Sequence, residues 1–159
     1  MLNPLDPIAV RVKRLRIIWF ALLLGVASFY LVVWFILKGG RDQLPPPMDP
    51  SYLIALGVLF LIPLLVSPFV RRKVEATPRD ASEEAIADRW QAGWVIGQAL
   101  KEATGIGGLV LALLAGSTAY AFAFTVASVL SMLMTPPWEH ELRLRIHRAT
   151  GTAGTSLGG

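Results

Sequence analysis

The chain has 159 residues, of which 54% are hydrophobic and only 16% are charged, and its mean hydropathy is +0.56. A soluble domain of this length cannot bury that much apolar surface, whereas a lipid bilayer accepts it. The formal net charge of +4 does not indicate nucleic-acid binding, because the basic residues flank apolar runs, as they do in membrane proteins. The absence of cysteine excludes disulfides, thiolate metal ligands and a cysteine nucleophile.

Two apolar runs occupy the first half of the chain. Residues 17–37 carry no charge and are long enough to cross a hydrocarbon core of about 30 Å. This run follows a basic arm, as in a signal peptide, but it is longer than the usual apolar region of a signal peptide and lacks a small-x-small cleavage site, so we expect a retained anchor. A proline-rich connector leads to a second span at 51–70, which contains Pro63 and Pro68, and membrane helices tolerate such prolines.

The second half holds a polar segment and two closely spaced apolar runs. Residues 71–91 form the predicted cytoplasmic loop, whose second part begins a helix that continues into a third span at 92–115. Gly116 and Ser117 supply the turn into a fourth span at 118–135. The final residues, 151–159, are rich in glycine, serine and threonine, which predicts a disordered tail.

These elements define one domain. The sequence predicts an all-α polytopic membrane protein with four transmembrane helices, in which helices 3 and 4 form a tight hairpin. Residues 1–150 make up the single membrane domain. Its lipid-facing surface makes the bilayer itself the first partner that we expect.

Lysine and arginine counts predict the orientation of the four spans. Twelve of these residues lie in the N-terminal arm, in the middle loop and after the fourth span, whereas only Lys38 and Arg41 lie on the opposite side. Positively charged segments stay in the cytoplasm. We therefore expect a multi-pass protein with cytoplasmic N- and C-termini, whose basic loops contact anionic lipid headgroups.

Lys101 and Glu102 stand side by side near the middle of the third span. Glu102 is about ten residues, or about 15 Å at the rise of an α-helix, from either end of that span. An ionised carboxylate at this depth is unfavourable, so we expect Glu102 to be protonated, paired, or in contact with water or a polar partner.

Two interpretations of Glu102 follow. In the first, Glu102 is a reversible proton or cation site, because burial favours the neutral form of a carboxyl group. In the second, Glu102 is satisfied within the protein by Gln98, which lies one turn earlier on the same face, or by Lys101. The candidate ion-binding residues are therefore Glu102, Gln98 and Lys101.

Small residues recur at four-residue spacing along the last two spans. Such stripes allow helix backbones to approach closely in a bilayer. The main interpretation is close packing of the third span on the fourth. The alternative is contact with another subunit, since there are more stripes than one hairpin needs. The residues predicted to pack helices are Gly93, Gly97, Gly105, Gly108, Ala112, Gly116, Ala119, Ala123, Ala127 and Ser131.

The sequence contains no arrangement typical of an enzyme. Residues 105–108 are glycine-rich but lack the lysine pattern of a phosphate-binding loop. No Ser/His/Asp set is visible. His140 and His147 are too far apart for a metal-ligand pair on one helix face. We therefore predict no catalytic residues, no cofactor and no metal, and we expect that the protein is not an enzyme.

The segment from Ile96 to Leu114 resembles the C-terminal helix of the F-type ATP synthase c subunit. In that family the proton-binding carboxylate lies in a run of the form I-G-x-A-L-x-E-A-x-x-I-x-G-L-V-x-A-L-L, and Glu102 occupies its position. The resemblance implies an ion-carrying role for Glu102. The chain departs from the family in having Lys101 at an apolar position, a longer polar loop, only one glycine in the preceding span, and a further span after this helix.

The chain as a whole resembles small four-span bacterial inner-membrane proteins of no known activity, which implies a location in the bacterial inner (plasma) membrane. We expect a small integral subunit or accessory protein with a mid-membrane protonatable carboxylate, Glu102, that is coupled to protons. The alternative is a purely structural or assembly protein in which Glu102, Gln98 and Lys101 hold helices together. Either function predicts a homo-oligomer or a larger membrane complex.

Overall fold

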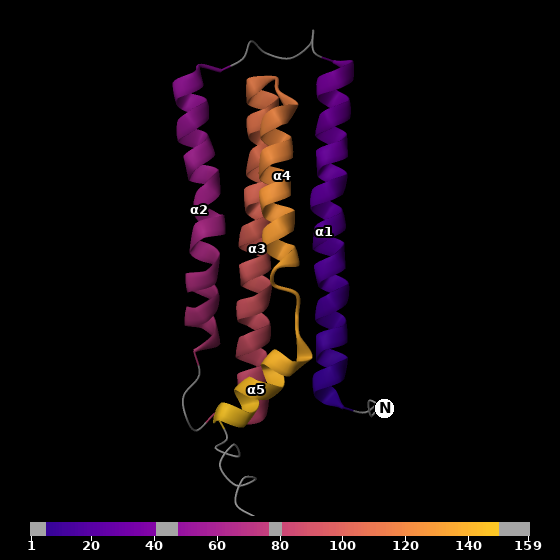
Figure 1. Cartoon of the computed structure of the whole chain (residues 1–159), viewed down its shortest axis with the longest axis vertical. Coiled ribbons are helices and arrows are strands. Elements are labelled where there is room, and N and C mark those ends of the chain that lie inside the picture. The colour runs from indigo at the N-terminus through magenta and orange to yellow at the C-terminus, as the bar shows by residue number, and fades with distance from the viewer. Residues whose placement is uncertain (1–5, 41–47, 77–80, 150–159) are drawn as a thin grey trace, which may run out of the picture.

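The computed structural model describes residues 6–40, 48–76 and 81–149, and the tail that the sequence predicts to be disordered lies outside these ranges. The described residues form helices and no strand, which confirms the all-α class. Helices α1 to α4 run along the long axis of the molecule, and α5 lies across one end, near the start of α1 (Figure 1). The helices are α1 (Pro7–Gly39), α2 (Pro50–Glu75), α3 (Glu83–Ala115), α4 (Thr118–Leu133) and α5 (Glu139–Ala149).

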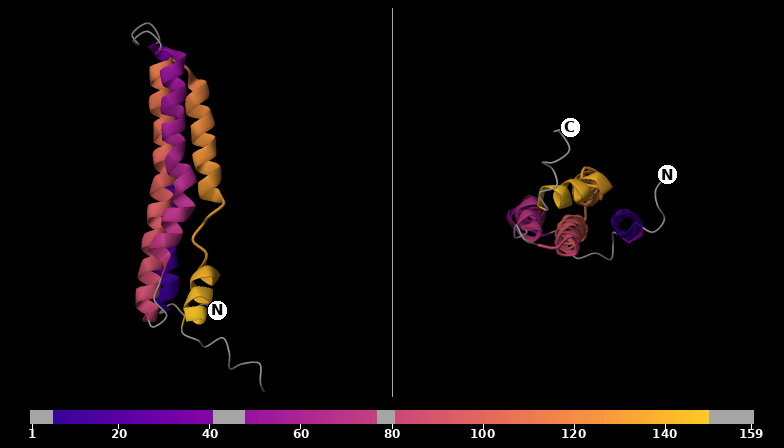
Figure 2. Two further views of the ribbon diagram at one scale, coloured as in Figure 1. Left: turned by 90° about the vertical axis from the view of Figure 1, so that its left-hand side faces the viewer. Right: turned by 90° about the horizontal axis from the view of Figure 1, so that it is seen from below.

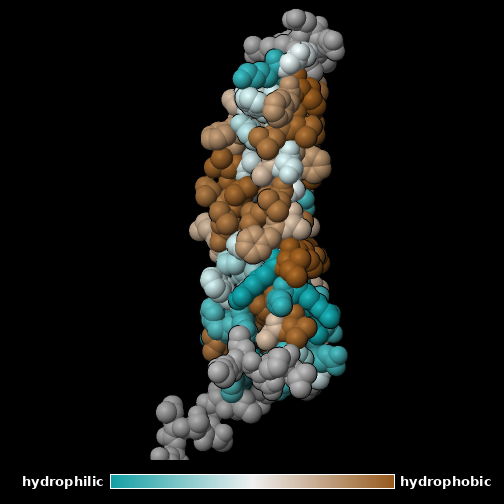
Figure 3. Space-filling model, turned by 90° about the vertical axis from the view of Figure 1, so that its right-hand side faces the viewer, coloured by the Kyte–Doolittle hydropathy of each residue, from teal (hydrophilic) through white to brown (hydrophobic). Residues whose placement is uncertain are grey.

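The outer surface of the bundle is that of a membrane protein. Within the described ranges three helices, α1, α2 and α3, are long and apolar enough to cross a membrane, and α4 is a shorter apolar helix of 16 residues. Large apolar side chains face outward, as Leu24, Leu65 and Phe69 do with exposed fractions of 66%, 66% and 69%. Seen from the side of α1, hydrophobic residues cover most of the bundle, and hydrophilic residues gather toward the end where α5 lies, which we call the α5 end (Figure 3). Such a surface suits lipid better than water.

The helices extend beyond the predicted spans at the α5 end. The predicted loop at 71–91 is largely helical, because α2 continues to Glu75 and α3 begins at Glu83. Ser82 is the N-cap of α3, and its side chain accepts a hydrogen bond from the backbone N–H of Ala85. Capping satisfies an amide that the helix leaves free, so the helix starts in the polar segment and not at the edge of the apolar run.

Helix α3 is the centre of the bundle. Half of its most apolar 18-residue stretch is buried, compared with 17% for α1 and 11% for α2. It packs against all the other helices, and a view along the bundle axis places it between α2 and α1 (Figure 2). The larger buried share explains why the third span is the least apolar of the three, because positions that face protein tolerate small and polar residues.

The glycines of α3 do not all face the same neighbouring helix. A Cβ atom on Gly93 would lie 2.5 Å from Cγ of Glu75, and one on Gly97 would lie 3.6 Å from Cβ of Arg71, so this pair faces α2. The expectation that the whole stripe packs on the fourth span is therefore wrong for Gly93 and Gly97. A Cβ atom on Gly105 would lie 3.1 Å from Oγ of Ser128, so Gly105 does face α4.

The contact side of α4 differs from the predicted stripe. Ala119 and Ala123 are exposed, and Ala127 and Ser131 are half-buried. The residues that α4 buries are Ala121, Ser128 and Met132. Four-residue spacing alone does not identify the buried face, because several faces of α4 carry small residues. Ala112, by contrast, is fully buried on α3.

Gly116 makes the hairpin turn between α3 and α4, as the sequence predicts. Its φ of 62° lies in the left-handed region, which favours glycine. The N–H of Gly116 donates to the carbonyl of Leu113, and the N–H of Ser117 donates to that of Ala112 at 3.0 Å. These bonds satisfy carbonyls at the end of α3, so the chain reverses with no polar loop.

Helix α5 covers the α5 end of the bundle. Leu142 and Ile146 pack with Val12 of α1 and with Trp90 of α3 in a buried cluster. Asp6 at the start of α1 forms an ion pair with Arg143 of α5, and hydrogen bonding to this guanidinium lowers the pKa of the Asp6 carboxyl. The helix that follows α4 is thus tied back to the start of α1.

Helix α4 approaches α3 so closely at Gly108 that a larger residue at this position should destabilise the hairpin. A Cβ atom there would lie 2.0 Å from Cβ of Phe124, and neither atom can rotate away. Gly108→Ala should therefore push α4 from α3 and lower the free energy of unfolding by about 1–3 kcal/mol. Gly39→Ala is the control, because nothing lies within 4 Å of that position, and its effect should stay within about 0.5 kcal/mol. Denaturation of the two purified variants with an unfolding detergent measures both free energies of unfolding. Equal stability of the two variants would contradict the close packing of α4 on Gly108.

Candidate functional site

The end of α4 gathers several polar side chains inside the bundle. The helix stops at Leu133, and Pro136 and Pro137 follow, so the chain cannot continue as an α-helix. The last carbonyl groups of a helix have no partner within the helix. Within a bilayer no water is available to replace those partners, so other parts of the protein must supply hydrogen-bond donors.

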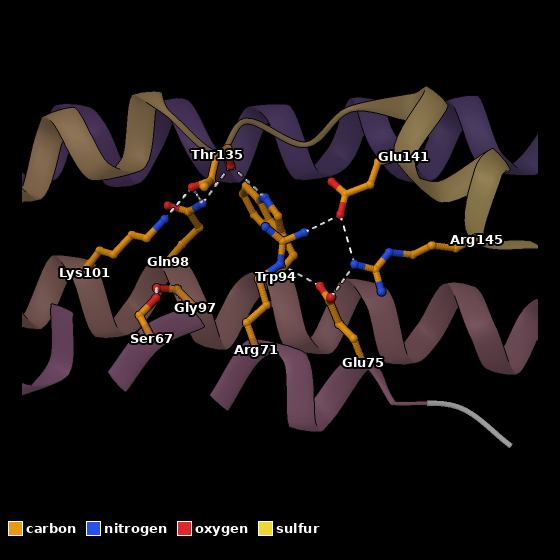
Figure 4. A network of polar contacts seen from close by, with 10 residues as sticks. All are labelled: Ser67, Arg71, Glu75, Trp94, Gly97, Gln98, Lys101, Thr135, Glu141 and Arg145. Carbon is orange, nitrogen blue, oxygen red and sulfur yellow. Dashed lines mark hydrogen bonds and ion pairs between the residues drawn. The ribbon is translucent and has the colours of Figure 1, made fainter. Parts of the chain in front are cut away.

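Helix α3 supplies three donors from one face. Trp94 Nε1 donates to the carbonyl oxygen of Thr135 at 3.1 Å, and Gln98 Nε2 donates to the same oxygen at 3.0 Å. Lys101 Nζ donates to the carbonyl oxygen of Ser131 at 3.0 Å and also to the Thr135 hydroxyl. The donors are spaced by four and three residues, which places them on one side of the helix. Figure 4 shows these side chains converging on Thr135.

Helix α1 adds a further donor. Trp19 Nε1 donates to the carbonyl oxygen of Met132 at 3.1 Å. Ser128 of α4 returns a bond to α3, since its hydroxyl donates to the carbonyl oxygen of Lys101 at 2.7 Å. The end of α4 is therefore bound by three indole or amide donors and one ammonium group. This arrangement fixes where the short helix ends relative to α1 and α3.

Lys101 has only uncharged partners. Its ammonium group binds a carbonyl and a hydroxyl, and no carboxylate among the described residues pairs with it. The C-terminal end of a helix carries partial negative charge, so the end of α4 is a favourable place for a cation. The lysine also directs its charge from the middle of α3 toward the α5 end, as lysines in membranes do.

Glu102 lies on a different side of α3. Its Oε1 would be 3.7 Å from a Cβ atom on Gly25 of α1, and the side chain is half-buried there. Among the described residues it has no hydrogen bond and no ion pair. The structure therefore does not unite the three candidate ion-binding residues, because Gln98 and Lys101 bind the end of α4 whereas Glu102 faces α1.

The neighbouring helix defines the depth of Glu102. Gly25 lies eight residues after Ile17 and twelve before Leu37, the ends of the uncharged run of α1. These separations correspond to about 12 Å and 18 Å along a helix. Glu102 thus lies well inside the apolar layer. A carboxyl group without a partner at this depth needs a proton, a cation or a polar group from another molecule.

A second polar cluster links α2 with α5. Arg71 Nε donates to Glu75 at 2.6 Å, and its NH2 group donates to Glu141 of α5 at 2.8 Å. Arg145 lies 2.7 Å from Glu75 and 3.1 Å from Glu141. The Glu75 side chain is only 2% exposed, so its charge depends on both arginines (Figure 4).

A cleft of about 520 Å³ joins the two clusters. Lys101, Ser131 and Thr135 line one part of the cleft, and the ion pairs between α2 and α5 line another. Its volume is in the range of ligand pockets. Among the described residues no group of three or more His, Asp or Glu side chains could hold a metal ion.

Several of these residues did not stand out in the sequence. Thr135 could have been noticed because it precedes two prolines, where α4 must end with free carbonyls. The spacing of Trp94 to Gln98 also indicates a shared face. The pairing of Arg71 and Glu75 with Glu141 had no comparable signal, since α2 and α5 are far apart in the sequence and surface charge runs are common.

Comparison with known proteins adds no family to this description. No protein-family model, no curated protein and no solved structure matches the chain. The interpretation of the site therefore depends on the geometry of its own residues.

The two donors to the Thr135 carbonyl should show coupled contributions to stability. Trp94→Phe or Gln98→Leu alone leaves the oxygen with one partner, and each should cost about 1 kcal/mol or less in hydrogen bonding. The double variant leaves the carbonyl without either indole or amide donor, which should add about 1–3 kcal/mol beyond the sum of the single effects. A double-mutant cycle on the free energy of unfolding measures this coupling. Strict additivity would mean that the two side chains do not share an essential acceptor.

Proposed function

We propose that this chain is a small integral membrane subunit or accessory protein in which Glu102 is a reversible carboxyl group coupled to protons. The observation that carries the proposal is the isolation of Glu102, which lies against α1 without a hydrogen bond or ion pair among the described residues. Its neighbour Lys101 is engaged by the end of α4, so the lysine does not neutralise the carboxylate.

The chemistry of such a position favours proton exchange. A carboxyl group in an apolar layer is stable when neutral and becomes reactive toward a base or a cation that reaches it. The side chain lies at the border between α3 and α1, where the neighbouring α3 residues Ala103 and Ile106 are exposed. A second subunit or a water file could therefore approach Glu102 from the lipid side. The role proposed for Glu102 is accordingly one of proton exchange and not of catalysis.

Carbodiimide labelling tests the proposal directly. These reagents react with protonated carboxyl groups in apolar surroundings, so Glu102 should be modified in native-like membranes, and the labelling should fade as the pH rises. Mass spectrometry locates the modified residue. Glu75 is the matched control, because it is more deeply buried but paired with Arg71 and Arg145, and it should remain unmodified.

A second variant separates the role of Glu102 from folding. Glu102→Gln should remain folded, lose the labelling and lose any pH dependence of association with its partner. If Glu102 is unlabelled at every pH, or if the glutamine variant retains the full pH dependence, the proton-coupled function is wrong.

We further propose that α4 is a fourth membrane span and that both termini are cytoplasmic, in a bacterial inner (plasma) membrane. Helix α4 is antiparallel to α3 and is about 24 Å long at the rise of an α-helix, which is close to the thickness of a hydrocarbon core. The basic residues of the N-terminal arm and of α5 lie at one end of the bundle, as the positive-inside rule requires. Anionic headgroups would surround this end.

Single cysteines test this topology, because the native chain has none. Ala119→Cys and His140→Cys place one exposed thiol near each end of α4. In intact cells a membrane-impermeant maleimide should label Ala119→Cys and should reach His140→Cys only after lysis. Labelling of both positions from one side would show that α4 does not cross the membrane.

The alternative function is purely structural. It is supported by the hydrogen bonds of Gln98 and Lys101, which hold α3 to the end of α4. In that case Glu102 would bind a polar group of another subunit, in a homo-oligomer or a larger complex. The structural function predicts that Glu102→Ala loses the assembly and that carbodiimide does not label the native protein, whereas the proton-coupled function predicts labelling.

A further inference from the structure

The cleft between α2, α3 and α5 contains two cations that nothing in the described chain neutralises. Of its four cationic residues, Arg71 and Arg145 are paired with the two carboxylates, Glu75 and Glu141. Arg72 forms no hydrogen bond or ion pair with any described residue, and Lys101 binds only uncharged oxygens. Four cations against two carboxylates leave a surplus of two positive charges along this cleft.

The cleft lies where a bilayer changes from apolar to polar. Its α2 wall runs from Leu64 to Glu75, about 17 Å at the rise of an α-helix. Leu64, Pro68 and Met134 supply apolar lining, and Pro68 and Met134 are exposed to the surroundings of the bundle. The arginines follow toward the α5 end, and the ammonium group of Lys101 lies beside Ser67, between the two parts of the cleft (Figure 4). Apolar lining at one end of the cleft and positive charge at the other match the acyl chain and the acidic headgroup of a lipid.

We propose that this cleft binds one anionic phospholipid, with its phosphate near Arg72 and Lys101 and the start of an acyl chain along Leu64, Pro68 and Met134. Arginine and lysine both bind phosphate oxygens, and a negative headgroup would balance the two unpaired cations. This site differs from a general attraction of lipid to basic loops, because it needs particular residues of α2 and α3. It is also independent of the proposed role of Glu102, which lies on the α1 side.

A lipid explains the features of the cleft better than a soluble anion. A soluble phosphate would not use the apolar lining, and it would have to leave water to reach Lys101. The volume of about 520 Å³ suits a headgroup and the first part of a chain, and the remaining chain can lie on exposed α2 residues such as Leu65 and Phe69.

Native mass spectrometry of the full-length protein tests the site. The protein should retain phosphatidylglycerol in preference to phosphatidylcholine, which has the same phosphate but no net charge. Arg72→Gln should weaken retention of phosphatidylglycerol by about fivefold, because it removes a direct charge-assisted contact with the phosphate in the cleft. Lys73→Gln is the matched control, because Lys73 is the next exposed cation on α2 but does not line the cleft, and it should change retention by less than about twofold.

Three outcomes would overturn the proposal. Equal retention of the two lipids would show that charge does not select the occupant. Equal losses in Arg72→Gln and Lys73→Gln would reduce the effect to general surface charge. The third outcome concerns inorganic phosphate. If the protein binds phosphate with the same dependence on Arg72 and shows no preference between the lipids, the cleft binds a soluble anion and not a lipid. Because both substitutions lie at exposed positions, folding is not expected to obscure the comparison.

Discussion

The end of α4 is the constraint on which the rest of the structure depends. A helix of 16 residues is followed by two prolines, so the carbonyl groups at its end and just beyond it lie within the bundle, where side chains of other helices donate hydrogen bonds to them. Trp94, Gln98 and Lys101 of α3 and Trp19 of α1 donate to these carbonyls. The need to satisfy them explains why α3, the central helix, carries polar residues inside an apolar span, and it fixes the relative heights of α1, α3 and α4.

This arrangement separates two residues that are adjacent in the sequence. Consecutive residues of a helix point about 100° apart, so Lys101 and Glu102 face different neighbours. Lys101 interacts with the negative end of α4, whereas Glu102 lies against Gly25 of α1 with no partner among the described residues. The polar groups of α3 therefore divide into a set that stabilises the bundle and one carboxyl group that remains available to something outside it. The proposed function depends on that division.

The α5 end has a different organisation from the membrane-embedded part. Here α5 turns across the bundle, buries Leu142 and Ile146, and pairs Glu141 and Arg145 with Arg71 and Glu75 of α2. Buried ion pairs gain little stability against their desolvation, but they require a particular partner for each charge and so favour one arrangement of the helices. They also form one wall of the cleft that reaches Lys101, which connects the polar surface of the protein with the interior of the membrane-embedded part.

The sequence by itself determined the helical class and the hairpin turn at Gly116, and three of the four spans that it predicted are helices of membrane-spanning length, because apolar run length and glycine conformation are local properties. It could not determine which face of each helix is buried, since Gly93 and Ala119 belong to similar stripes but only Gly93 meets another helix. It also could not determine that Lys101 would bind the end of α4 or that Arg71 would meet Glu141. Those contacts join residues 30 and 70 positions apart, and only the packing of the helices decides them.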